Sequence, residues 1–126
     1  MDHPEETTMG HYADVAADLR DPTRALRRAI PDTWAGFGQL HQHAVADGAL
    51  PTRLKETIAL TIAVVKQCDG CISYHARAAA KAGATHAEVA EALGVALLMD
   101  GGTASVYGPR AFDAFCEFAG PPPGEG

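Results

Sequence analysis

The chain has 126 residues, which is the usual size of a single domain, and its 47% hydrophobic and 21% charged residues are typical of a globular protein. The formal net charge is -6, with no basic cluster beyond Arg24, Arg27 and Arg28, which argues against a nucleic-acid partner. The most apolar run, Ile58 to Val65, is far shorter than the ~20 residues that span a bilayer, so no membrane partner is expected.

The two ends of the chain have the composition of flexible tails. Residues 1–10 are acidic and polar without the apolar core of a secretory signal, which predicts a cytoplasmic protein, and residues 120–126 are mostly Pro and Gly. We expect one domain over residues 11–119 between these tails. Cytosolic thiols are kept reduced, so a close pair of cysteines in such a chain is more often catalytic or metal-binding than structural.

The first part of the domain predicts two helices. Residues 11–30 predict a weak helix that is interrupted at Asp21-Pro22. Residues 32–46 predict a stronger one, with Asp32 as its N-cap and Gly48 just beyond its end. The apolar stripe of this second helix consists of Trp34, Phe37, Leu40 and Val45.

The middle of the chain predicts a helical hairpin. One helix starts with Pro51 in its first turn and has apolar residues on nearly all sides after Lys55, which indicates a buried helix. The next begins at or just after Cys68 and ends before Gly83, a residue suited to a left-handed cap.

The last part predicts two more helices. Thr85 to Glu88 has the capping-box pattern and opens a helix that runs to about Met99. Residues 103–118 predict the final helix, kinked or restarted at Pro109. Helical spacing throughout predicts an all-α, single compact domain of about six helices, with more apolar surface than so small a chain can cover, and therefore an oligomer.

Two cysteines and a histidine form the most distinctive motif. Cys68 lies at the predicted helix start, where unpaired backbone N–H groups favour a thiolate. Cys71 and His75 are four residues apart, so they share one helix face, and the imidazole can accept the thiol proton. A pair at this spacing can also form a reversible disulfide.

Glu56 is a carboxylate within an otherwise apolar helix. It shares a stripe with Leu60, Ala63 and Gln67 that leads toward the cysteines, so it can face His75 and exchange a proton with it. Alternatively, Glu56 is half exposed in the first turns of its helix and pairs with Arg53 or Lys55.

The chain resembles the carboxymuconolactone decarboxylase-like superfamily, and within it the alkylhydroperoxidase D group, in four residues at fixed separations: Glu56, Cys68, Cys71 and His75. The surrounding sequence LPTRLKETIALTIAVVKQCDGCISYHARAAAKAGAT shares the resemblance, which runs from about Pro31 to Phe118.

The resemblance implies a thiol-dependent alkyl hydroperoxide reductase or disulfide oxidoreductase. Cys71 would reduce the peroxide, Cys68 would resolve the sulfenic acid, and Glu56 with His75 would form the proton relay. It also implies no metal or bound flavin, a Cys68–Cys71 redox-active disulfide, an external dithiol reductant such as a lipoyl group or a thioredoxin-like protein, and homotrimers or homohexamers. The best-known members have a relay histidine just before the second cysteine, where this chain has Gly70.

Four alternatives stay open. A zinc site would need a fourth ligand from Cys116, Glu56 or His43, and a thioredoxin-like fold would need strands that the pattern does not predict. A lactone decarboxylase of the carboxymuconolactone type would not rely on a Cys-x-x-Cys pair. In a non-catalytic helical scaffold, the cysteines would only be small buried hydrophobes.

Overall fold

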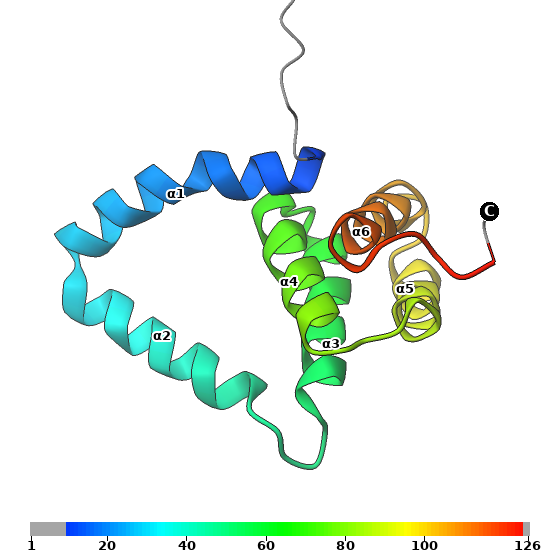
Figure 1. Ribbon diagram of the computed structural model, residues 1–126, viewed down its shortest axis with the longest axis horizontal. Helices are drawn as coiled ribbons and strands as arrows, with labels where there is room; N and C mark the ends of the chain where they lie inside the picture. Colours follow the sequence, from blue (N-terminus) through cyan, green and yellow to red (C-terminus); the bar gives the residue numbers. More distant parts are fainter. Residues whose placement is uncertain (1–9, 125–126) are drawn as a thin grey trace, which may run out of the picture.

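The computed structural model describes residues 10–124, which form six α-helices and no strand (Figure 1). The helices are α1 (His11–Ala29), α2 (Pro31–Val45), α3 (Thr52–Lys66), α4 (Asp69–Lys81), α5 (His86–Asp100) and α6 (Ala104–Ala119). The all-helical prediction is therefore confirmed. The expected flexible tails at residues 1–10 and 120–126 lie partly outside the described residues.

The α3–α4 hairpin forms the centre of the molecule. In Figure 1, α5 and α6 lie on one side of it and α1 and α2 extend to the other side as a bent arm. We call residues 11–45 the α1–α2 arm. A single residue, Ile30, joins its two helices, and α2 makes few contacts with the rest of the chain.

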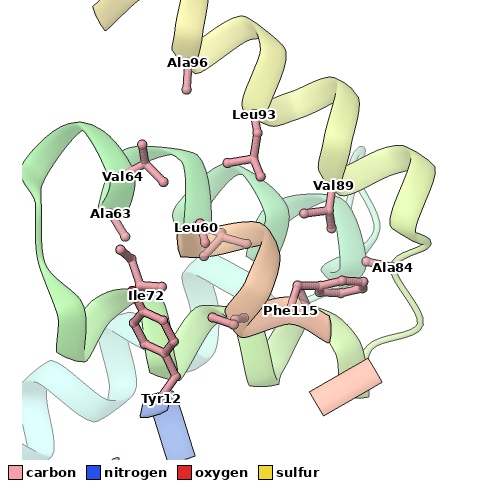
Figure 2. Packing of buried hydrophobic residues seen from close by; sticks show 14 of the residues in the cluster. Tyr12, Leu60, Ala63, Val64, Ile72, Ala84, Val89, Leu93, Ala96 and Phe115 are labelled. Atoms are coloured by element: carbon pink, nitrogen blue, oxygen red, sulfur yellow. The ribbon is translucent and has the colours of Figure 1, made fainter. Parts of the chain in front are cut away.

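The core lies between α3, α4, α5 and α6 (Figure 2). Leu60 and Ile72 of the hairpin pack with Val89 of α5 and Phe115 of α6, and all four are 0% exposed. Several alanines, among them Ala76 and Ala111, are equally buried, and such small side chains let the helices approach closely. Tyr12 extends this core to the first turn of α1.

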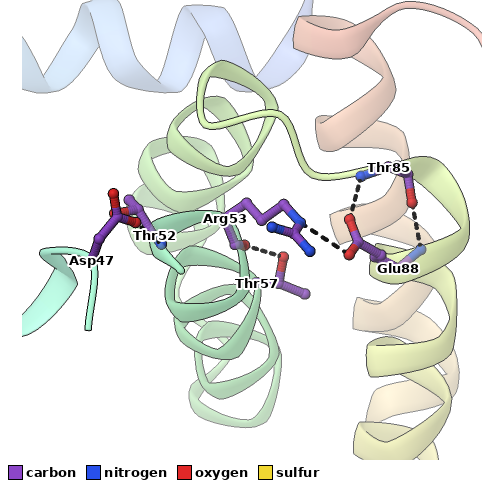
Figure 3. Close-up of polar contacts among 6 residues, drawn as sticks. All are labelled: Asp47, Thr52, Arg53, Thr57, Thr85 and Glu88. Atoms are coloured by element: carbon purple, nitrogen blue, oxygen red, sulfur yellow. Dashed lines mark hydrogen bonds and ion pairs between the residues drawn. The ribbon is translucent and has the colours of Figure 1, made fainter. Parts of the chain in front are cut away.

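Polar contacts between distant segments fix the helix ends. The Glu117 carboxylate of α6 accepts backbone N–H bonds from Tyr12 at 3.1 Å and Ala13 at 3.3 Å, so it caps α1. Figure 3 shows Glu88 accepting hydrogen bonds from Arg53 of α3 and from the backbone of Thr85. The Thr85–Glu88 capping box is therefore present as predicted, and it also ties α5 to α3.

A second cap in Figure 3 orients the start of α3. The carboxylate of Asp47 accepts hydrogen bonds from the backbone N–H of Thr52 at 2.8 Å and from its hydroxyl at 3.0 Å. These two hydrogen bonds lower the pKa of Asp47. Helix α3 begins at Thr52, and Pro51 is its N-cap residue, so the proline lies just before the first turn rather than in it as predicted.

Neither proline inside a helix breaks it. The predicted interruption at Asp21-Pro22 is wrong, because α1 continues through Pro22 to Ala29. Pro22 is exposed, so water can reach the carbonyl that its missing N–H leaves without a backbone partner. Pro109 likewise lies inside α6, which does not restart there.

Two helices bury less surface than the sequence predicted. Helix α3 is buried along one side, whereas Ile58 and Ile62 on the other are 47% and 50% exposed. Helix α2 starts at Pro31 rather than after an Asp32 cap, and none of its residues is buried. Its predicted stripe exists, but Phe37 and Leu40 are 60% and 65% exposed, since no other helix of residues 10–124 covers them.

No helix within residues 10–124 has both the length and the apolar character that are needed to cross a membrane.

Candidate active site

The turn between α3 and α4 places the two cysteines at a helix start. Gln67 adopts the left-handed conformation with φ 56° and ends α3, and Cys68 follows as the N-cap of α4. The N–H of Cys71 donates to Sγ of Cys68 at 3.2 Å, so the sulfur takes the position that a Ser or Asp oxygen has in an ordinary cap. Cys68 and Cys71 are joined in a disulfide, with 5.2 Å between their Cα atoms.

Glu56 and His75 form a second pair beside the cysteines. Oε1 of Glu56 on α3 lies 2.8 Å from Nδ1 of His75 on α4. Glu56 is 3% exposed, so the alternative of a half-exposed carboxylate paired with Arg53 or Lys55 is wrong. Arg53 pairs with Glu88 instead.

This pairing fixes the roles of the two imidazole nitrogens. A carboxylate accepts hydrogen bonds and does not donate them, so Nδ1 of His75 carries the proton in the pair. In the neutral ring, Nε2 then has the lone pair and can act as a base. Because His75 follows Cys71 by four residues, the ring lies over the same helix face as the cysteine.

Gly70, between the two cysteines, lies against the side chain of Leu19 on α1. A Cβ atom at this position would lie 2.9 Å from Cδ1 of Leu19, closer than carbon atoms approach each other. A larger side chain at position 70, such as the histidine of the best-known members, would therefore need the Leu19 side chain to shift.

His41 was missed as a site residue by the sequence reasoning. Its ring on α2 lies 5.4 Å from the ring of Tyr74 and 6.3 Å from that of His75, measured between centroids. Its Nε2 is buried, and no hydrogen-bond partner for it occurs among residues 10–124. No local pattern could reveal this, because His41 comes from a separate helix and reaches the pair only through the fold.

Tyr12 and Asp69 lie on the other side of the α4 start. Burial of the phenol, together with the nearby Asp69 carboxylate, raises the pKa of Tyr12 to about 12. The hydroxyl of Ser73 donates to the carbonyl of Tyr12, which fixes α1 against the first turns of α4. Tyr12 therefore stays a neutral phenol at physiological pH and packs the start of α1 against the start of α4.

The other chemical candidates lie elsewhere. Within residues 10–124, no three His, Cys, Asp or Glu side chains are grouped as metal ligands. His43 is exposed on α2, and Cys116 is partly buried on α6.

A family model described as the carboxymuconolactone decarboxylase family matches residues 31–115, which include all four motif residues. The chain belongs to the carboxymuconolactone decarboxylase family. Its predicted superfamily is thereby confirmed, while the chemistry must be argued from the site.

Two relatives match this family member over most of the length of both chains. An uncharacterized protein from Cupriavidus necator is 36% identical over 91 residues, 72% of this chain and 80% of that protein. Uncharacterized protein 4 in the cox locus of Paracoccus denitrificans is 38% identical over 106 residues, which are 84% of this chain and 92% of that protein.

A solved structure shares the fold of this family member. It is the crystal structure of an apo carboxymuconolactone decarboxylase family protein from Legionella pneumophila, with a TM-score of 0.83 and 39% sequence identity. The match covers 86% of this chain and 96% of that one. The arrangement of the helices that positions the site is therefore one that the family adopts.

Proposed function

We propose that the protein is a thiol-dependent hydroperoxide reductase, or a disulfide oxidoreductase of the same chemistry. The observation that supports this most directly is the buried Glu56 carboxylate bonded to His75, one helical turn from a cysteine that pairs with Cys68. A thiol, a base and a second thiol are the groups that a dithiol peroxidase needs.

In the first step, His75 removes the proton of the Cys71 thiol while Glu56 stabilises the imidazolium. The thiolate attacks the terminal peroxide oxygen, so an S–O bond forms and the O–O bond breaks. The leaving alkoxide takes the proton from His75 and departs as an alcohol. The sulfur of Cys71 is left as a sulfenic acid.

In the second step, the Cys68 thiol gives up its proton and its sulfur attacks the sulfenic sulfur; the S–O bond breaks, and the leaving hydroxide takes that proton and departs as water, which gives the Cys68–Cys71 disulfide. The N–H of Cys71 that bonds Cys68 Sγ stabilises negative charge on this sulfur. An external dithiol, such as a lipoyl group or the dithiol of a thioredoxin-like protein, then exchanges with the disulfide and becomes oxidised in turn. This cycle needs no metal or flavin.

His41 adds a positioning group to this relay. Its Nε2 is buried, and its ring lies beside those of Tyr74 and His75, with centroid distances of 5.4 Å and 6.3 Å. We infer that this contact holds the His75 ring in position for the relay.

We also propose that the protein works as a homo-oligomer, a trimer or a hexamer. The support is the exposed apolar surface of the α1–α2 arm and the outer side of α3, which includes Phe37, Leu40, Ile58 and Ile62. Light scattering on the purified protein should give a mass of three or six chains, and a monomer at all concentrations would contradict this.

The function is tested with Cys71→Ser and Cys68→Ser, using tert-butyl hydroperoxide and dithiothreitol as the dithiol. Cys71→Ser should abolish turnover, whereas pre-reduced Cys68→Ser, freed of dithiothreitol before the peroxide is added, should consume one equivalent of peroxide and stop at the sulfenic acid. Full activity in both variants would rule out the mechanism. If both instead retain the ability to decarboxylate a muconolactone, the alternative reaction of the family becomes the better account.

A further inference from the structure

A groove of about 530 Å³ lies between α1 and α4, next to the cysteine loop. Five basic side chains line it: Arg20, Arg24 and Arg27 from α1, and Arg77 and Lys81 from α4. We call it the basic groove. Its volume is that of a small-molecule site.

The concentration of positive charge is unexpected in this chain, which has 10 Lys and Arg against 16 Asp and Glu. The α1 cations recur at helical spacing and form one stripe, and so do Arg77 and Lys81 on α4, so two like-charged stripes line the same groove. The ion pair between Arg24 and Asp21, at 3.7 Å with both side chains well exposed, contributes little. A bound anion would remove this repulsion.

The groove is not uniformly polar. Ala16, Leu19 and Ala78 form apolar patches between the cations, and most of the exposed lining is apolar. A ligand that fits therefore has an apolar body and an anionic group. A carboxylate suits the guanidinium of Arg77, since the two can form paired charge-assisted hydrogen bonds.

One end of the groove lies at the reactive loop, because Gly70, between the two cysteines, is among its lining residues. Arg77 and Lys81 follow Gly70 by seven and eleven residues, which places them about 10 Å and 16 Å further along the helix axis at ~1.5 Å per residue. A ligand whose anionic group is bound by these two cations would extend its apolar body toward the disulfide.

We propose that the basic groove binds a carboxylate-bearing organic hydroperoxide, such as a fatty-acid hydroperoxide, and that this is the preferred substrate of Cys71. The proposal rests on the peroxide chemistry proposed above. The thiolate attacks the terminal oxygen of the bound molecule, the O–O bond breaks, and the products are the Cys71 sulfenic acid and a hydroxy fatty acid.

The first test measures binding without redox chemistry. Laurate, below its critical micelle concentration, is titrated into the oxidised protein by calorimetry at low ionic strength. The double variant Arg24→Gln/Arg77→Gln, with one change in each wall, should weaken binding by about tenfold or more, the effect of losing charge-assisted hydrogen bonds. Arg28→Gln is the matched control, because Arg28 is exposed on α1 and does not line the groove.

The second test compares rates of Cys71 oxidation by linoleic acid hydroperoxide and by its methyl ester. We expect the acid to react about tenfold faster than the ester in the wild type and in Arg28→Gln, and this preference to disappear in the double variant. Tert-butyl hydroperoxide, a neutral peroxide, should react equally with the wild type and with Arg28→Gln.

The outcomes separate this proposal from the proposed function. Equal rates for acid and ester in the wild type would overturn the substrate assignment and leave the peroxidase intact. No reaction with any peroxide, the neutral one included, would overturn both. If the double variant changes the oligomeric mass while laurate does not bind, the groove is an interface between copies of the chain and the proposal is wrong.

Discussion

The α3–α4 hairpin and the α1–α2 arm have similar lengths but very different environments. Leu60, Val64 and Ile72 of the hairpin are 0% exposed, whereas Phe37 and Leu40 of the arm are more than half exposed. The hairpin holds the motif residues rigidly by packing within the chain. The arm contributes His41 and one wall of the basic groove. The arm thus borders the site, whereas the four motif residues all lie in the hairpin.

The largest expected effect is a difference in folding stability between a core substitution in the hairpin and a surface substitution in the arm. Leu60→Ala should lower the free energy of unfolding by about 2–5 kcal/mol, because it leaves a cavity in the core. Leu40→Ala should change it by less than about 0.5 kcal/mol at a protein concentration that keeps the chain monomeric. Urea denaturation of both variants measures the difference. Equal losses would mean that the arm is as well packed as the hairpin.

The next effect concerns the buried carboxylate of the hairpin. Glu56→Gln keeps the shape of the side chain but removes the charge that stabilises a His75 imidazolium. We expect Cys71 oxidation by peroxide to slow by about 100-fold, the usual contribution of a general acid–base pair. Stopped-flow kinetics measure it, with Glu91→Gln on the exposed side of α5 as control. An unchanged rate would remove Glu56 from the relay.

A smaller effect tests the contribution of the arm to the same chemistry. His41→Phe keeps a ring against Tyr74 but removes both nitrogens, and we expect the rate to fall by about tenfold. The pH profile of the rate should also shift, because the variant loses one titratable imidazole from a cluster that also contains Tyr74, His75 and Glu56. His43→Phe, two residues away and exposed, is the matched control. Identical pH profiles for both variants would leave His41 with a packing role.

The smallest effect concerns the link between α3 and α5. The backbone hydrogen bond from Thr85, followed by the contact with Arg53, lowers the pKa of Glu88 below its ordinary value of 4.5. The folded state therefore favours the charged form. The stability gained is present above pH 4.5 and is lost as the pH falls through the lower folded-state pKa.

Glu88→Gln should weaken this acid sensitivity, since the amide oxygen can still accept from Thr85 but does not titrate. Urea denaturation between pH 3 and pH 6 measures the change. Parallel curves for variant and wild type over that range would contradict the role assigned to Glu88.

Local sequence patterns predicted the hairpin better than the arm. Apolar spacing predicted α3 and α4 almost to their ends, and the i, i+4 relation of Cys71 and His75 needs no tertiary information. The stripe through Glu56 correctly indicated a contact with His75, because both residues lie on adjacent helices joined by a short turn.

The rest depends on contacts that local patterns do not encode. The proline rule predicted a break at Pro22, but an exposed proline can stay within a helix when water satisfies the freed carbonyl. The cap of α1 comes from Glu117, more than a hundred residues away. His41 reaches the site from a helix whose own apolar stripe has no cover within the described part of the chain.

The central claim is that Cys68 and Cys71 form a redox-active pair, and intact-protein mass spectrometry tests it most directly. The fully reduced protein is mixed with one equivalent of hydroperoxide, and the mass is recorded before and after addition of a dithiol. The account predicts rapid loss of the mass of two hydrogen atoms, located in the Cys68–Cys71 peptide and restored by the dithiol. If both thiols stay reduced and alkylate slowly, the redox account is wrong.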